Sequence, residues 1–99
     1  MKIAFDLDDT YLKDRKLFNH LYDKFKNAGH HVGIISCRAQ RGCDLNFEPD
    51  FEFYGNLAGP IIQPQIEYKT RIMEENNIDI LFDDMAEFYP SGIVVIRII

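Results

Sequence analysis

Two aspartates separated by one residue follow the first hydrophobic segment of the chain, Lys2–Phe5. In an extended strand alternate side chains point to the same side, so Asp6 and Asp8 are expected to lie together. Two neighbouring carboxylates repel each other unless a cation or a shared proton compensates their charge. The pair therefore predicts a compensated acidic site. The alternative is that Asp8, Asp9 and Thr10 form an ordinary strand exit, in which an aspartate or the threonine caps the helix that follows.

Two further hydrophobic segments also end in polar residues. Ser36 closes the apolar run that begins at His31, and Asp83 and Asp84 follow the run 78–82. The carboxyl ends of parallel strands are where open α/β sheets place their sites. If these segments are parallel strands, their polar ends form one acidic rim, and a positive group is needed there.

The elements that would position this rim alternate between strand and helix. Hydrophobic patterns predict strands at 2–7, 31–37, 51–54, 78–82 and 92–98. They predict helices at 14–28 and 64–77 and a helical turn at 85–89. Asp14 and Gly29 are expected to bound the first helix, Pro64 suits the first turn of the second, and one helix face gathers Leu17, Phe18, Leu21, Tyr22 and Phe25. The alternation predicts an α/β fold with a mainly parallel five-stranded sheet and helices on both faces.

Composition limits the chain to one small domain, residues 1–99, with a net charge of −5. No broad basic surface for nucleic acid is expected. Cys37 and Cys43 have neither the usual zinc spacing nor a disulfide pattern, which favours two free thiols in the cytoplasm. No apolar segment is long enough to span a bilayer, so no membrane association is expected.

The order Asp-Leu-Asp-Asp-Thr, then Ser, then Lys, then Asp-Asp resembles the four motifs of the haloacid dehalogenase (HAD) superfamily. The matching positions are 6–10, Ser36, Lys69 and the pair 83–84, which together cover almost the whole chain. The family often has Gly where Asp9 stands, although Asp is also seen there. The resemblance implies a Rossmann-like, three-layer fold.

The resemblance also implies a Mg²⁺-dependent phosphatase that works through an aspartyl-phosphate on Asp6. The metal ligands would be the Asp6 carboxylate, the Asp8 backbone carbonyl and Asp83. Asp84 would support the metal through water or orient Lys69. Asp8 would act as acid and then base, Ser36 would bind a phosphoryl oxygen, and Lys69 would neutralise negative charge.

The segments in which such enzymes insert a cap domain are short in this chain, so the resemblance is to a capless member. Capless members accept large phosphorylated substrates or borrow a lid from a partner subunit, which would make a homo-oligomer. The expected substrate is a phosphorylated small molecule or the phosphorylated end of a macromolecule. Arg38 would hold a second anionic group of the substrate, or it would pair, like Arg41, with Asp44 or Glu48.

Other interpretations need different residues. A response-regulator receiver would require an aspartate at the end of the third strand, where the chain has Tyr54, Gly55 and Asn56. A Toprim-like site would place a glutamate before the Asp-x-Asp pair. The alternative that stays open is a catalytically silent HAD-like protein that binds metal and a regulatory partner. Asp8 argues against it, because a binding module does not need an acid–base residue.

Overall fold

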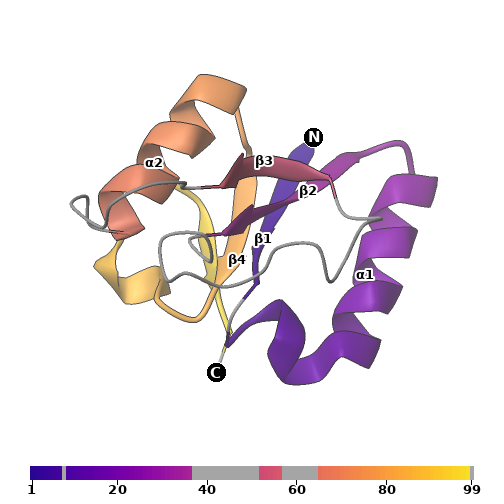
Figure 1. The fold of residues 1–99 in the computed structure, drawn as a ribbon. Coiled ribbons are helices and arrows are strands. Elements are labelled where there is room, and N and C mark those ends of the chain that lie inside the picture. The colour runs from indigo at the N-terminus through magenta and orange to yellow at the C-terminus, as the bar shows by residue number, and fades with distance from the viewer. Residues whose placement is uncertain (8, 37–51, 57–64, 99) are drawn as a thin grey trace.

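A computed structural model of the protein describes residues 1–7, 9–36, 52–56 and 65–98 (Figure 1). These residues form β1 (Lys2–Asp6), η1 (Tyr11–Asp14), α1 (Arg15–Asn27), β2 (His31–Ser36), β3 (Phe53–Asn56), α2 (Gln65–Asn76), β4 (Ile80–Asp83), η3 (Ala86–Phe88) and β5 (Val95–Arg97). The elements labelled η are short 3₁₀ helices. Within the described ranges, no helix combines the length and the apolar character that a membrane span requires.

The described strands form one five-stranded sheet in the order β3-β2-β1-β4-β5, and every neighbouring pair is parallel. This confirms the predicted α/β fold with a parallel sheet. The chain runs outward from β1 through β2 and β3, then crosses back to β4 on the other side of β1. Asp6, Ser36 and Asp83 are the last residues of β1, β2 and β4, so they end at the same edge of the sheet.

The face of the sheet that α1 covers has an aromatic core centred on Phe5. The Phe5 ring is fully buried, stacks on Phe82 at 4.9 Å between centroids, and meets Phe18 edge-on at 5.6 Å. Tyr22, one helical turn after Phe18, is also buried. Leu17 was expected on this apolar face but is 48% exposed, because it lies in the first turn of α1 and lines a surface cavity instead.

The ends of α1 agree with the sequence prediction. The Leu17 backbone N–H donates to Asp14 Oδ1 at 3.2 Å, which satisfies one of the amides that a helix start leaves unpaired. Gly29, just beyond the helix, has a φ of 91°, a left-handed conformation that favours glycine. The residues 11–14 before α1 form η1, a turn that the hydrophobic pattern did not predict.

The opposite face of the sheet is covered by α2, and the two helices lie on opposite sides of the strands (Figure 1). Met73 of α2 packs in a buried cluster with Ala4, Ile35, Ile78 and Leu81. The predicted helix began at Pro64, which lies outside the described residues, and the observed one ends at Asn76. With a helix on each face, the sheet is the middle of three layers.

Four strands differ from their predicted limits, and one of them, β5, covers only Val95–Arg97 of the predicted 92–98. β3 was expected to end before Gly55, but it runs from Phe53 to Asn56 and Gly55 pairs with Ile35 across a register shift. Glycine therefore marks an irregularity of the strand here rather than its end. β4 spans Ile80–Asp83 instead of 78–82, so Asp83 is a strand residue and its side chain is fixed by the sheet. β1 ends at Asp6 rather than at Leu7.

Candidate active site

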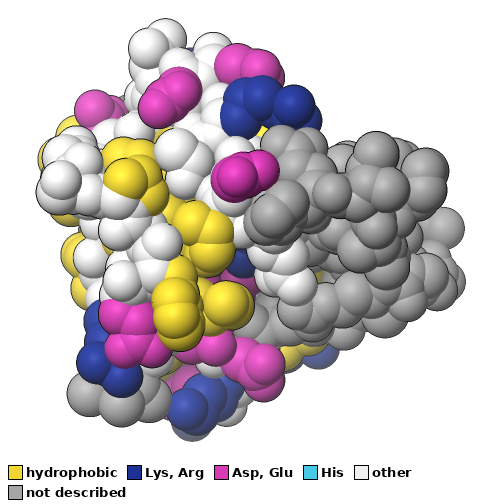
Figure 2. All heavy atoms as spheres, turned by 90° about the vertical axis from the view of Figure 1, so that its left-hand side faces the viewer, with side chains coloured by type: hydrophobic (Ala, Val, Ile, Leu, Met, Phe, Trp, Pro, Cys, Tyr) yellow, Lys and Arg dark blue, Asp and Glu magenta, His cyan; other side chains and the backbone are white. Residues whose placement is uncertain are grey.

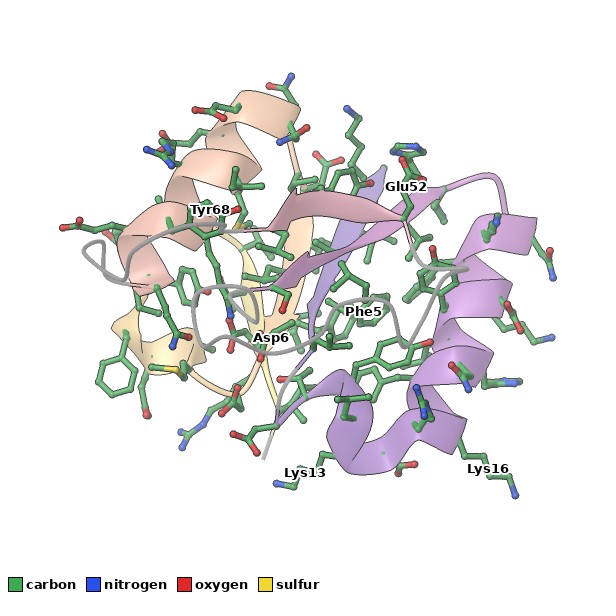
Figure 3. All side chains as sticks on the ribbon, in the orientation of Figure 1. Phe5, Asp6, Lys13, Lys16, Glu52 and Tyr68 are labelled. Carbon is green, nitrogen blue, oxygen red and sulfur yellow. The ribbon has the colours of Figure 1, made fainter. Side chains whose placement is uncertain are left out.

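The three central strands bring their last side chains to the same edge of the sheet. β1 lies between β2 and β4, so Asp6 is flanked by Ser36 on one side and Asp83 on the other. All three residues are at most 6% exposed. Figure 3 shows Asp6 at this edge, at the end of the strand that also carries Phe5. The structure thus gathers three of the residues that the sequence predicted for the site.

Lys69 reaches this edge from α2 and joins two of the aspartates. Its ammonium nitrogen lies 2.6 Å from Asp6 Oδ1 and 3.2 Å from Asp83 Oδ2. The Lys69 residue is only 2% exposed, whereas a lone lysine on a helix usually points into solvent. A buried ammonium needs charged partners, and two carboxylates satisfy this requirement.

The Thr10 hydroxyl contacts the carboxylates of Asp6 and Asp84. The hydroxyl oxygen lies 3.2 Å from Asp6 Oδ2 and 3.3 Å from Asp84 Oδ1, and it accepts the Asp84 backbone N–H at 3.0 Å. A hydroxyl has one hydrogen, so it donates to one of these carboxylates at a time. The chain reaches Thr10 through a sharp turn at Asp9, whose φ is 60°.

Asp83 is fixed by groups that follow it in the chain. The Tyr89 hydroxyl donates to Asp83 Oδ2 at 2.7 Å, and the Met85 backbone N–H donates to Oδ1 at 3.0 Å. The sequence did not single out Tyr89, because the segment 85–89 was predicted only as a helical turn. From the sequence, Thr10 was expected only to be a member of the first motif or a cap for the following helix, and in the structure its side chain makes no cap hydrogen bond to η1. Asp84 was expected to orient Lys69 or support a metal, and in the structure it contacts Thr10.

The charges at this site are out of balance. Asp6, Asp83 and Asp84 each place a carboxylate oxygen within 4.8 Å of the others. Among the described residues, the cation at this cluster is Lys69, which contacts Asp6 and Asp83. Burial raises the pKa of Asp6 to about 7; Lys69 opposes this shift, and repulsion from Asp83 and Asp84 adds to it. Three carboxylates facing one ammonium leave negative charge that a proton or a metal ion can compensate.

The pKa values of Asp83 and Lys69 shift in the directions that favour their charged forms. Burial alone would raise the pKa of Asp83, but Lys69 and the bonds from Met85 and Tyr89 outweigh it, and the net pKa is lowered. Burial likewise opposes the charged form of Lys69, yet attraction to Asp6 and Asp83 raises its pKa above 10.5. At neutral pH, Lys69 and Asp83 are therefore ionised, and Asp6 is the group that takes up a proton.

The three aspartates form a donor set that suits Mg²⁺. Carboxylate oxygens are its preferred protein ligands, and an all-oxygen cluster of Asp6, Asp83 and Asp84 matches that chemistry. These are three of the four predicted metal ligands. The fourth, Asp8, lies outside the described residues, as does the predicted substrate ligand Arg38.

The raised pKa of Asp6 predicts how the stability of the metal-free protein depends on pH. Between pH 3.8 and about 7, folded Asp6 holds a proton that the unfolded chain has lost, so the free energy of unfolding should fall as pH rises through this window. The expected loss is on the order of a few kcal/mol. Urea unfolding in EDTA at about pH 5 and pH 8 measures it.

Asp6→Asn is the matched control for this measurement, because the amide mimics the protonated acid and does not titrate. The variant should be nearly as stable at the higher pH as at the lower one. The shifts of Asp83 and Lys69 act below pH 3.8 and above pH 10.5, outside the window. An equal fall in the parent protein and in Asp6→Asn would show that another group is responsible.

Comparisons of the chain with family models, curated proteins and solved structures gave no match. The interpretation of the site therefore rests on its own residues and geometry.

Proposed function

We propose that the protein is a Mg²⁺-dependent phosphomonoester hydrolase of the HAD type, with Asp6 as the nucleophile. The observation that carries the proposal is the buried contact of Lys69 with both Asp6 and Asp83 at the carboxyl edge of the sheet. An ion pair made only for stability would not need a second and a third carboxylate, since each additional one adds repulsion. Electrostatic repulsion of this kind between neighbouring carboxylates is typical of functional sites.

The arrangement of the fold supports the same proposal. The strand order β3-β2-β1-β4-β5 is that of a Rossmann-like sheet, in which ligands bind beyond the carboxyl ends of the strands. Asp6 ends the central strand, where the chain changes its direction across the sheet. We include in the proposal the three-layer HAD-like architecture without a cap domain.

In the proposed reaction, an Asp6 oxygen attacks phosphorus and forms a new P–O bond while the bond to the leaving oxygen breaks. Asp8 gives its proton to the leaving oxygen and later takes one from the attacking water, whose oxygen displaces Asp6 and releases phosphate. Lys69 neutralises charge on Asp6 and on the phosphoryl group, and Ser36 donates a hydrogen bond to a phosphoryl oxygen.

The carboxylate of Asp6 is positioned for this role by bonds to both of its oxygens. Lys69 donates to Oδ1, and Thr10 donates to Oδ2 when its one hydrogen is not shared with Asp84; together these bonds fix the plane of the carboxylate. Asp6 must be ionised to attack, whereas its pKa of about 7 favours a proton in part of the molecules at neutral pH. When bound to Asp6, Asp83 and Asp84, Mg²⁺ would supply the positive charge that favours the ionised carboxylate and compensates an approaching phosphate.

The proposed substrates are phosphorylated small molecules or the phosphorylated ends of macromolecules. On the side of the molecule that Figure 2 shows, Lys and Arg side chains are scattered among Asp and Glu. Together with the net charge of −5, this does not favour binding along a nucleic-acid backbone. We propose that Arg38 contacts a second anionic group of the substrate. We also propose that the enzyme acts in the cytoplasm.

A second candidate is a catalytically silent protein that uses the same cluster to bind metal and a regulatory partner. One observation favours it: both oxygens of Asp6 are already engaged, by Lys69 and by Thr10. A panel of phosphorylated metabolites, sugars, peptides and oligonucleotides assayed with Mg²⁺ separates the two candidates. Metal binding without hydrolysis of any member would support the silent protein.

Removal of metal is expected to abolish phosphatase activity. EDTA should stop hydrolysis, and added Mg²⁺ should restore it, because the carboxylates at the site carry more negative charge than Lys69 compensates. Ca²⁺ should support the activity poorly, since it prefers a larger and looser coordination shell. Release of inorganic phosphate is the measurement, and undiminished activity in excess chelator would contradict the metal site.

A further inference from the structure

β5 forms one margin of the sheet, and no other strand of the described residues pairs with its outer side. Its inner side is bonded to β4: Val94 O accepts the Leu81 N–H at 3.1 Å, and the Ile98 N–H donates to Asp83 O at 3.3 Å. The backbone of β5 and its flanking residues is therefore paired with β4 through positions of even number.

Backbone groups of successive residues in a strand point to alternate sides. Since positions 94 and 98 face β4, Ile96 faces it as well, and Val95 and Arg97 turn their N–H and C=O groups outward. Such outward groups are a template on which another strand can pair. The outer side of β5 thus offers two residues with four hydrogen-bonding groups.

Ile96 of β5 and the residues that flank the strand add an apolar stripe on one face of the sheet. Val94 is 57% exposed and Ile96 is 41% exposed, and Ile98 continues the same alternation at the margin of the core that α1 covers. Large apolar side chains left exposed in a row beside an unpaired strand favour association.

β5 is only three residues long, which itself limits edge pairing, but other devices that normally protect an edge strand are scarce here. The segment 92–98 contains no proline and no lysine, and Arg97 is its single charged residue. The Arg97 guanidinium is accompanied by Glu87, with Nη2 3.4 Å from Oε2. Because an acidic and a basic group lie side by side at this edge, a second copy of the same edge meets no excess of like charge.

We propose that β5 pairs with β5 of a second copy of the chain, antiparallel and about a two-fold axis at Ile96. In this register, Val95 of each copy lies opposite Arg97 of the other, and these are the outward-facing residues that an antiparallel strand bonds in pairs. Ile96 faces Ile96 in a non-hydrogen-bonded pair, in which side chains approach most closely.

We assign the strand that pairs with β5 to a second copy of the chain because the outer side of β5 is complementary to itself. A two-fold interface needs a surface that fits itself, and here the outward backbone groups, the apolar stripe and the Glu87–Arg97 pair all do so. Pairing would join the two sheets into one continuous sheet. The inference is independent of the proposed catalytic activity.

The mass of the protein in solution tests this interface. Light scattering over a concentration series should give twice the 11.6 kDa of one chain for the parent protein. Ile96→Lys should give a single chain, because a buried ammonium pair at the axis would repel. Leu17→Lys, a matched change at a site of similar exposure on α1, should remain dimeric. A parent protein that is monomeric throughout, or an Ile96→Lys protein as dimeric as the parent, would overturn the proposal.

Cysteine cross-linking tests the register and does not depend on the stability of Ile96→Lys. In a background where Cys37 and Cys43 are replaced by serine, Ile96→Cys should oxidise to a covalent dimer. Paired Cα atoms of a non-hydrogen-bonded pair are about 4.5 Å apart, within disulfide range. Val95→Cys should not cross-link, because its counterpart lies diagonally across the axis. Cross-linking of Val95→Cys alone, or of neither variant, would contradict the antiparallel register.

Discussion

Asp6→Asn is expected to abolish hydrolysis and leave the protein folded. The amide has the shape of the carboxylate and its oxygen still accepts the Lys69 bond, but it cannot form an aspartyl-phosphate. Loss of a nucleophile removes the whole covalent route, so the rate should fall by at least about 10⁴-fold. Phosphate release from an aryl and an alkyl phosphate in Mg²⁺ measures the loss.

Asp9→Asn is the matched control, because it makes the same chemical change three residues later at an exposed position. Asparagine tolerates the φ of 60° at this turn, so activity should stay near that of the parent. Beryllofluoride, which mimics the phosphorylated aspartate, should inhibit the parent protein and Asp9→Asn and fail to bind Asp6→Asn. If Asp6→Asn hydrolysed substrate at nearly the parental rate, Asp6 would be a metal ligand and not the nucleophile.

Lys69→Met is expected to impair both stability and activity. The change keeps the length of the side chain but leaves Asp6 and Asp83 buried without their cation. Breaking a buried ion pair in this way costs about 3–5 kcal/mol. Loss of one group that stabilises transition-state charge typically lowers the rate about 10²–10³-fold. Urea unfolding and phosphate release measure the two effects separately.

Arg71→Met on the same helix is the control for Lys69→Met. Arg71 is half-exposed, and its ion pair with Glu75, at 3.8 Å, lies in solvent. Such a pair contributes less than about 1 kcal/mol, so this variant should keep nearly full stability and activity. Mg²⁺ should recover part of the stability of Lys69→Met, because it replaces the missing positive charge. If the two variants behaved alike, the buried contacts of Lys69 would have no special importance.

The sequence predicted the part of the site that depends on strand ends. Asp6, Ser36 and Asp83 follow apolar segments, and the parallel topology that brings them together follows from the alternation of strands and helices. Lys69 was placed at the site by resemblance alone, because its position in a helix does not reveal whether it is buried. The structure shows that it is.

What the sequence did not predict depends on the exact path of turns. The Thr10 hydroxyl reaches both Asp6 and Asp84 only because the chain turns sharply at Asp9. Tyr89 meets Asp83 because the turn through η3 returns the chain to the end of β4. Neither contact has a periodic pattern, so hydrophobic alternation carries no information about it. The limits of β3 were wrong for a similar reason, since a register shift moved the pairing of Gly55.

The central place of β1 in the sheet has a consequence for how the protein reaches its folded state. Asp6 lies near the start of the sequence, but its partners Lys69 and Asp83 come 63 and 77 residues later. Closing such long loops slows folding, and no early segment of a growing chain can complete the cluster by itself. Until α2 and β4 have docked, the Asp6 side chain remains solvated and keeps the pKa of an ordinary aspartate. The titration of this one carboxyl would therefore report, during refolding, the moment at which the two halves of the sheet join.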